Sequence, residues 1–196
     1  DQNFSKFLNN TNSPTDLSEL TIVIPTFNRP SYLIRQIIYL SNCSANLIIA
    51  DGSENKIQKE IIDKLKNLKP FDYIHSADLS YVERIKFASQ KIQSKYAMCL
   101  AEDDFLIFSG LKKALNILND DQSLSACFGQ IAALDYNKSK NKSYLVEYGS
   151  SLKNYSIRHT NPKERLLFAF NSYRSFSPYA VFKQKHFKEI WSRIDT

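Results

Sequence analysis

Four apolar runs alternate with amphipathic segments in the first two thirds of the chain, and this alternation constrains the fold more than any other feature. The first run, residues 20–24, is apolar or β-branched throughout, as in a strand that is buried on both faces. The segments between the runs carry apolar residues at helical spacing. Strands that alternate with helices are typical of a largely parallel sheet, which predicts an α/β fold. We expect these strands at residues 20–24, 47–50, 71–75 and 96–101.

The rest of the chain, from residue 121 onward, has a less regular pattern. Lys, Asn and Ser are frequent in its middle part, which favours a long excursion or a hairpin over regular core structure. We expect a strand at 124–133, the excursion or hairpin at 135–158, a helix that begins near Pro162, a strand at 179–182 and a helix at 186–194.

Polar features follow three of the first four strands at the point where each strand ends. The first is the loop at residues 25–30, the second is Asp51, and the third is the triplet Glu102-Asp103-Asp104. Right-handed crossovers bring the carboxyl ends of parallel strands to one edge of a sheet. Ligands of open α/β sheets bind beyond that edge. The sequence therefore predicts a ligand site at this edge.

The acidic triplet is the sharpest of these features. Three adjacent carboxylates repel one another at neutral pH, and a bound cation relieves the repulsion. Mg²⁺ and Mn²⁺ prefer oxygen ligands, and Mg²⁺ commonly joins one or two carboxylates to substrate phosphates. Residues 102–104 are therefore a candidate metal site, although a solvated turn whose acids precede a helix N-terminus has the same sequence pattern.

Asp51 and Arg84 are the other candidate binding residues. Asp51 follows a buried strand and precedes Gly52, so it is either an ordinary turn residue or a carboxylate that accepts a hydrogen bond from a nucleobase. The Arg84 guanidinium suits a diphosphate, or it belongs to an exposed helix and pairs with Glu83.

The net charge of +6 is unevenly distributed along the chain. Residues 1–135 carry 14 basic and 16 acidic side chains, whereas residues 136–196 carry 12 basic and 4 acidic ones. The basic part suits a phosphate-rich acceptor, an anionic polysaccharide or an inner membrane surface, and it is equally consistent with a solvated face. Because the basic residues form no tight run, we expect no nucleic-acid partner.

Several classes of protein lack their sequence signals here. Four glycines provide neither a P-loop nor a dinucleotide-binding fingerprint, and no Gly-x-Ser-x-Gly elbow of an α/β-hydrolase occurs. Cys43, Cys99 and Cys127 are too widely spaced for a zinc site, so we expect buried free thiols in a reducing cytoplasm. No run is long and apolar enough to span a bilayer, and residues 1–20 contain no signal peptide pattern.

Three segments together resemble the family 2 glycosyltransferases of the GT-A fold. Residues 20–30 are similar to the family's opening strand and loop, and residues 48–53 to its Asp-Asp-Gly-Ser segment, with Ala50 in place of the first aspartate. Residues 96–104 are similar to the strand that carries the family's Asp-x-Asp motif. Order and spacing agree over residues 20–120, so the resemblance implies a Rossmann-like open sheet, mostly parallel and flanked by helices.

The resemblance also implies roles for individual residues in nucleotide binding. Asp51 would bind the base, commonly uracil, and Arg84 would contact the base or the phosphates. Asp103 would lie near the ribose or the donor sugar. The loop residues that would line the base pocket are Pro25, Thr26 and Phe27.

A divalent cofactor, Mn²⁺ or Mg²⁺, follows from the same resemblance. Asp104 would be the principal metal ligand, and Glu102 would be the first acid of a Glu-x-Asp version of the motif. The metal would neutralise the leaving diphosphate as a Lewis acid.

Inverting members of the family use a carboxylate base well downstream of the Asp-x-Asp strand, after a segment like residues 179–187. Asp195 lies too close to that segment, and Glu147 and Glu164 are the other acids of this part of the chain. The catalytic base therefore stays unassigned. A chain without a base would bind its donor without transferring the sugar, since general-base help is worth about 10²–10⁴-fold in rate.

We therefore expect a glycosyltransferase that moves a sugar from a nucleoside diphosphate, with UDP favoured, to a hydroxyl of a glycan or lipid-linked acceptor in polysaccharide synthesis. Residues 1–19 would be a flexible lead-in, residues 20–120 the nucleotide-sugar-binding α/β domain, and residues 121–196 the acceptor-side part of the same domain, in truncated form. Location in the cytoplasm, with peripheral contact to the inner membrane surface, fits the basic second part. The alternatives are a non-catalytic sugar-nucleotide-binding module, a nucleotidyltransferase, which would carry a Gly-rich loop at 25–30, and a receiver domain.

Overall fold

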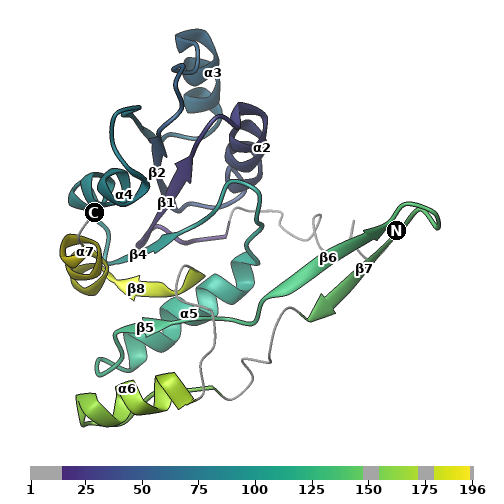
Figure 1. Ribbon diagram of the computed structural model, residues 1–196. Helices are drawn as coiled ribbons and strands as arrows, with labels where there is room; N and C mark the ends of the chain where they lie inside the picture. Colours follow the sequence, from purple (N-terminus) through teal and green to yellow (C-terminus); the bar gives the residue numbers. More distant parts are fainter. Residues whose placement is uncertain (1–14, 148–154, 172–178, 195–196) are drawn as a thin grey trace. The chain divides into compact units, whose positions relative to one another are not determined.

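The computed structural model describes residues 15–147, 155–171 and 179–194, which divide into two compact units (Figure 1). The first unit comprises Asp1–Cys127 and Pro178–Thr196, and the second comprises Phe128–Ser177. The first unit thus takes up a late segment of the chain, which supplies the strand β8 (Val181–Lys183).

A six-stranded sheet, in the order β3-β2-β1-β4-β8-β5, forms the centre of the first unit. β1 pairs in parallel with β2 and with β4, and β2 pairs in parallel with β3, whereas β8 is antiparallel to both of its neighbours. This arrangement confirms the predicted α/β fold with a mostly parallel sheet. The remaining strands are β1 (Leu20–Thr26), β2 (Asn46–Asp51), β3 (Asp72–His75), β4 (Tyr96–Cys99) and β5 (Ala126–Cys127).

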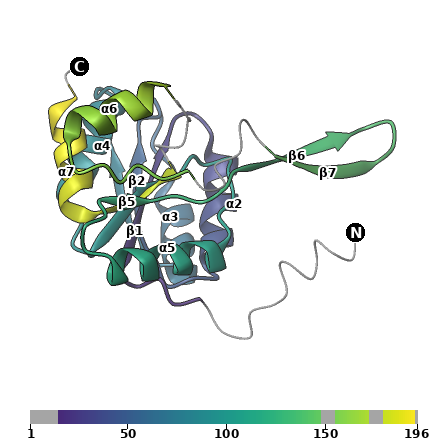
Figure 2. The same ribbon diagram turned by 90° about the horizontal axis from the view of Figure 1, so that it is seen from below.

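Helices cover both faces of this sheet (Figures 1 and 2). Three of them pack on one face through a shared apolar cluster: α2 (Pro30–Leu40), α3 (Lys59–Leu68) and α5 (Phe108–Asp120). Two pack on the opposite face through a second cluster: α4 (Tyr81–Gln90) and α7 (Gln184–Arg193). A parallel sheet with both faces covered is what the uninterrupted apolar strands predict.

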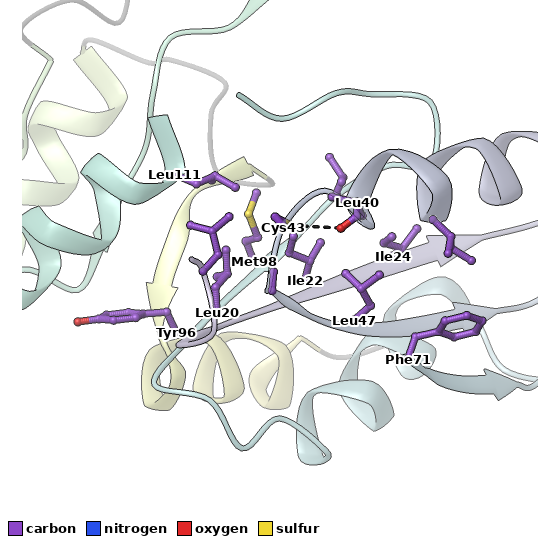
Figure 3. Close-up of a cluster of buried hydrophobic side chains, with 14 of the residues drawn as sticks. Leu20, Ile22, Ile24, Leu40, Cys43, Leu47, Phe71, Tyr96, Met98 and Leu111 are labelled. Atoms are coloured by element: carbon purple, nitrogen blue, oxygen red, sulfur yellow. Dashed lines mark hydrogen bonds between the residues drawn. The ribbon is translucent and has the colours of Figure 1, made fainter. Parts of the chain in front are cut away.

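β1 shows how the sequence pattern produces this layering. Every residue of the strand is buried, and successive side chains point to opposite faces. Leu20, Ile22 and Ile24 join the cluster under α2, α3 and α5, whereas Val23 joins the cluster under α4 and α7. Figure 3 shows the first of these clusters, in which Met98 of β4 and Leu111 of α5 also take part. Full burial of each such aliphatic side chain contributes about 1.5–3 kcal/mol.

Two of the helix starts, those of α2 and α4, follow local rules for helix N-termini. Pro30 occupies the first turn of α2, and its fixed φ suits that position. α4 begins with a capping box, because the Ser80 hydroxyl accepts from the Glu83 backbone N–H while the Glu83 carboxylate accepts from the Ser80 N–H. Ser109 does not cap α5, although serine is a common N-cap residue: the helix begins at Phe108, and its N-cap residue, Ile107, provides no side-chain hydrogen bond.

The second unit contains a hairpin and a helix. β6 (Ala132–Asn137) and β7 (Lys142–Glu147) pair antiparallel, which confirms the expected hairpin, and α6 (Pro162–Asn171) begins where the sequence predicts. The expected single strand at 124–133 is wrong, because β5 ends at Cys127 and β6 begins only at Ala132. The interruption contains Gly129, a residue that weakens a strand interior.

Two of the cysteines are free thiols in the core. Cys43 and Cys99 are buried, as expected, whereas Cys127 is half-buried. Burial raises the pKa of the Cys99 thiol to about 12, so this side chain behaves as an unreactive apolar group. No helix within the described ranges has the length and the apolar character that a bilayer crossing requires.

Candidate functional site

The carboxyl edge of the parallel strands brings the predicted site residues together. Thr26 at the end of β1 lies opposite Asp51 at the end of β2, and the Leu100 N–H donates to the Val23 carbonyl at 3.0 Å on the β4 side. The loop after β4 then carries the acidic triplet. β1 lies between the other two strands, so a single ligand can touch all three loops.

Asp51 is fully buried, and its carboxylate is already well engaged. One oxygen accepts from the Ser53 backbone N–H at 2.8 Å and from the Ser53 hydroxyl at 2.5 Å, and the other accepts from the Tyr73 hydroxyl at 2.5 Å. Burial and this bond to Asp51 raise the pKa of Tyr73, so its phenol stays a donor. A carboxylate offers about four lone-pair sites, so three bonds leave one free. Asp51 thus shapes the turn at Gly52 and Ser53.

Arg84 packs directly against that turn. A Cβ atom on Gly52 would lie 1.8 Å from Nη1 of Arg84, so only glycine leaves room for the guanidinium. Nη1 donates to the Leu79 carbonyl at 2.9 Å, while the buried Nε finds no hydrogen-bond partner within the described residues. The expected pairing with Glu83 is replaced by the capping box, so in the part of the chain described here the cation has no carboxylate partner. A buried guanidinium without an anion suits a negatively charged ligand.

The loop that follows β1 is held against the same turn. The Gly52 N–H donates to the Thr26 carbonyl at 3.0 Å, and the Asn28 N–H donates to the Ser53 hydroxyl at 2.8 Å. Asn28 has a φ of 55°, a left-handed conformation that asparagine tolerates better than most residues. Pro25 and Thr26 are buried, whereas Phe27 is 52% exposed. Of the three residues predicted to line a base pocket, Pro25 and Thr26 belong to β1 rather than to the loop, and only Phe27 is open to solvent.

Arg29, the next residue of this loop, reaches the acidic triplet. Its Nη1 lies 2.9 Å from Oδ2 of Asp103 and 3.6 Å from Oε1 of Glu102. Glu102 is buried, whereas Asp103 is exposed. The repulsion that the sequence predicts among the three acids is therefore relieved in part by a cation that the protein itself supplies.

Asp104, the third acid, has a different partner. Its Oδ2 accepts a hydrogen bond from the Tyr179 hydroxyl. Burial, followed by this bond and the nearby charges of Asp104 and Asp103, raises the pKa of Tyr179, so the phenol remains neutral. A neutral donor orients Asp104 without cancelling its charge.

A cavity of about 150 Å³ opens beside the triplet. Tyr81 at the start of α4 and Tyr179 contribute aromatic walls, and Glu102 contributes the charged group. Typical ligand pockets start at about 300 Å³, so this cavity accommodates one part of a nucleotide sugar rather than the whole. Its lining residues are Pro25, Tyr81, Cys99, Leu100, Ala101, Glu102 and Tyr179.

The residues present fit a metal that is shared with a substrate. Within the described ranges no three His, Cys, Asp or Glu side chains are arranged to hold an ion by themselves. Glu102 and Asp104 nevertheless provide two oxygen donors on one loop, the type and number that Mg²⁺ takes when phosphates complete its coordination. Asp103 is the least suited of the three, because Arg29 occupies one of its oxygens.

The acids considered as a catalytic base remain unassigned. Glu164 of α6 lies 3.6 Å from His159, with which it pairs when that imidazole is protonated. Asp195 lies outside the described residues, as does the side chain of Glu147.

Arg29, Tyr81 and Tyr179 are the site residues that the sequence analysis missed. Arg29 lies in the loop at residues 25–30, and its position just after β1 was the one signal in the sequence for its role. No local sequence pattern points to Tyr179, because it lies 75 positions after Asp104 in the chain.

Comparison with known proteins identifies the fold and the family. Residues 21–191, well over half of the chain, match the family model described as glycosyl transferase family 2. No curated protein matches this chain significantly in sequence.

Solved structures of Staphylococcus aureus TarS share the fold. TarS 1–349 in complex with UDP has a TM-score of 0.59 at 11% identity, covering 87% of this chain and 48% of that one. TarS 1–349 in complex with UDP-GlcNAc has a TM-score of 0.55 at 12% identity, with coverages of 87% and 47%. A further TarS structure has a TM-score of 0.53 at 13% identity, covering 87% of this chain and 29% of that one. This chain therefore spans less than half the length of each. The mostly parallel sheet flanked by helices agrees with these structures, and the match over residues 21–191 shows that the chain belongs to glycosyl transferase family 2.

Proposed function

We propose that this chain binds a nucleoside-diphosphate sugar, with UDP favoured, and transfers the sugar to a hydroxyl acceptor in glycan or polysaccharide synthesis. One observation carries the proposal: the carboxyl edge of the sheet holds a buried cation that pairs with no carboxylate among the described residues and, across β1, a set of carboxylates. Arg84 is the cation, and Glu102 and Asp104 are the carboxylates available to a metal. A diphosphate that carries a divalent ion has the complementary pair of charges.

The roles follow from this placement. Arg84 and the turn at Gly52 face the nucleotide, and Asp51 holds that turn through Ser53. Phe27 is the exposed aromatic side chain beside it, suited to stacking on a base. The complexes of TarS with UDP and with UDP-GlcNAc support a uridine nucleotide as the first choice to test.

The proposed reaction is an inverting displacement. The acceptor oxygen forms a bond to the anomeric carbon, the bond from that carbon to the diphosphate oxygen breaks, and the hydroxyl proton passes to a base outside the assigned residues. Bound Mn²⁺ or Mg²⁺ would supply Lewis-acid stabilisation of the leaving diphosphate. Glu102 and Asp104 would hold the ion, and Asp103, paired with Arg29, would lie near the donor sugar.

The acceptor that we propose is a glycan or a lipid-linked molecule, used in the cytoplasm with peripheral contact to the inner membrane surface. The excess of basic residues after residue 135 supports an anionic acceptor or surface. Buried free thiols at Cys43 and Cys99 are compatible with a reducing compartment.

A second candidate is a sugar-nucleotide-binding module without turnover. The observation that favours it is the composition of the cavity, where Glu102 is the one carboxylate among the described lining residues. If Glu102 holds a metal, no lining acid is left to act as the base.

Calorimetric titration with UDP, GDP, dTDP and CMP, each with Mn²⁺, Mg²⁺ or EDTA, tests the proposal. We expect one nucleotide to bind with metal and to lose most of its affinity in EDTA and in Asp104→Ala. Asp63→Ala, an exposed acid of α3, is the matched control and should bind as the wild type does. A turnover assay with the matching sugar nucleotide then separates the enzyme from the binding module. If no nucleotide binds under any condition, the proposal is wrong.

A further inference from the structure

The three acids at the end of β4 have different partners, although they are adjacent in sequence. Arg29 pairs with Asp103 at 2.9 Å and contacts Glu102 at 3.6 Å, so these two share one guanidinium charge. The Asp104 carboxylate accepts a hydrogen bond from the Tyr179 hydroxyl, and within the described residues it takes part in no other hydrogen bond or ion pair. The other oxygen of the Asp104 carboxylate, Oδ1, therefore has no partner within the described residues.

The sheet fixes Tyr179 in this place. β8 runs antiparallel to β4, with Phe182 opposite Ala97 and Lys183 opposite Tyr96. The chain that enters β8 therefore passes the carboxyl end of β4, where Ala180 is fully buried and anchors the residue before it. Tyr179 itself is half-buried and lines the cavity beside Glu102.

We infer that Tyr179 is a positioning residue that orients the Asp104 carboxylate for the metal of the proposed nucleotide site. The inference rests on the proposed function and goes beyond it, because it assigns a purpose to the segment before β8. A hydroxyl suits this task better than a cation would: it fixes one oxygen of Asp104 and leaves the negative charge for the ion. Hydrogen-bond partners of metal ligands typically change metal affinity about 10–100-fold when they are removed.

The test is a titration of Mn²⁺ into the UDP-saturated protein, read by calorimetry and by the electron paramagnetic resonance signal of free Mn²⁺. Tyr179→Phe keeps the ring and removes the hydroxyl. We expect it to weaken Mn²⁺ binding about 10–100-fold and to leave the affinity for UDP in EDTA within about twofold, because the ring still lines the cavity. Tyr32→Phe is the matched control: Tyr32 is a partly exposed tyrosine of α2 whose hydroxyl has no hydrogen bond among the described residues, and its variant should bind Mn²⁺ as the wild type does.

A double-mutant cycle separates positioning from a general structural effect. In an Asp104→Asn background, Tyr179→Phe should have no further effect on Mn²⁺ binding, because the carboxylate that it orients is gone. An equal loss in both backgrounds would contradict the inference, as would a Tyr179→Phe variant with wild-type Mn²⁺ affinity. Failure of the wild type to bind Mn²⁺ and UDP at all would overturn the proposed function together with this inference, so the two failures are distinguishable.

Discussion

The contact between Gly52 and Arg84 illustrates how much of the site depends on single residues. The guanidinium occupies the space where any other residue at position 52 would place its Cβ, with Cζ of Arg84 at 2.1 Å from that point. Gly52 is required here for close approach, since two groups cannot share this volume. The Asp51-Gly52 pair, which has the sequence of an ordinary turn, therefore also provides the surface against which the buried Arg84 guanidinium packs.

Gly52→Ala should consequently damage both stability and binding. The added methyl group must displace Arg84, and overpacking of this kind costs about 1–3 kcal/mol. We expect a lower midpoint in urea unfolding and a weaker affinity for UDP in calorimetry. Gly110→Ala is the matched control: its Cβ would meet nothing closer than 3.9 Å, and alanine favours the α5 helix by about 0.5–1 kcal/mol. If Gly52→Ala and Gly110→Ala have the same urea midpoint and the same affinity for UDP, the placement of Arg84 does not depend on Gly52.

Charge compensation is also decided residue by residue. The sequence predicts repulsion among three acids and a cation that relieves it. The structure supplies Arg29 for two of them and a neutral hydroxyl for Asp104. Sequence reasoning could identify the acids because they are adjacent, whereas their partners come from residues 29 and 179, which only the fold brings near.

At the scale of elements, helix α4 determines where Arg84 points. The helix begins at Tyr81, so Arg84 lies one turn into it and returns to the Leu79 carbonyl just before the start. The capping box of Ser80 and Glu83 fixes that start, and hydrogen bonding of the Glu83 carboxylate to the Ser80 side chain and to the Ser80 backbone N–H lowers the pKa of Glu83. α4 packs on β1 and β2 through Ile85 and Ala88.

Ser80→Ala should therefore destabilise the first unit by about 1 kcal/mol, the usual cost of a lost N-cap. The Glu83 part of this stabilisation depends on pH. Because the folded pKa of Glu83 lies below its ordinary value of 4.5, this contribution to stability is present above pH 4.5 and is lost as the pH falls through the lowered folded pKa. We expect the free energy of unfolding, measured in urea between pH 3 and 7, to be higher for the wild type than for Ser80→Ala. This difference in free energy should become smaller toward pH 3. A difference that is constant across this range would contradict the ionised capping box.

β8 is the element that brings Tyr179 to the acidic loop after β4. Its antiparallel addition beside β4 places a residue from the end of the chain against the acidic loop. An apolar run at 179–182 predicts a strand, but no local pattern predicts its neighbours or its direction. The pairing of β8 with β4 depends on which edge of the sheet is free, and this is a property of the folded unit.

At the scale of the whole molecule, charge is separated along the chain. The basic excess after residue 135 includes the turn of the β6–β7 hairpin, where Lys138, Lys140 and Lys142 are exposed. Exposed apolar side chains on the same hairpin include Leu134 and Tyr136. Lysines beside aromatic and aliphatic groups are suited to an anionic lipid surface.

If the hairpin contacts the membrane, replacing these three lysines with glutamine should release the protein from anionic vesicles. Each lysine near such a surface contributes about 1 kcal/mol, so the triple variant should bind about 100-fold more weakly at low salt. Co-sedimentation with phosphatidylglycerol-containing vesicles measures this, with neutral phosphatidylcholine vesicles as the background. Glutamine at Lys59, Lys64 and Lys113, exposed lysines of the first unit, is the matched control. Equal loss in both variants would indicate a general charge effect, and no binding by the wild type would exclude the contact.

The sequence by itself determined the layered α/β fold, the strand ends that carry Asp51 and the acids, and the family resemblance. These features are local: burial on both faces requires apolar strands, and parallel strands direct their carboxyl ends to one edge. Only the tertiary structure decided that Asp51 is buried and that the Arg84 guanidinium packs against Gly52. It also decided that Arg29 pairs with Asp103 while Tyr179 donates a hydrogen bond to Asp104. These contacts join residues far apart in the chain, and their partners are chosen by sheet order and packing, which no short stretch of sequence encodes.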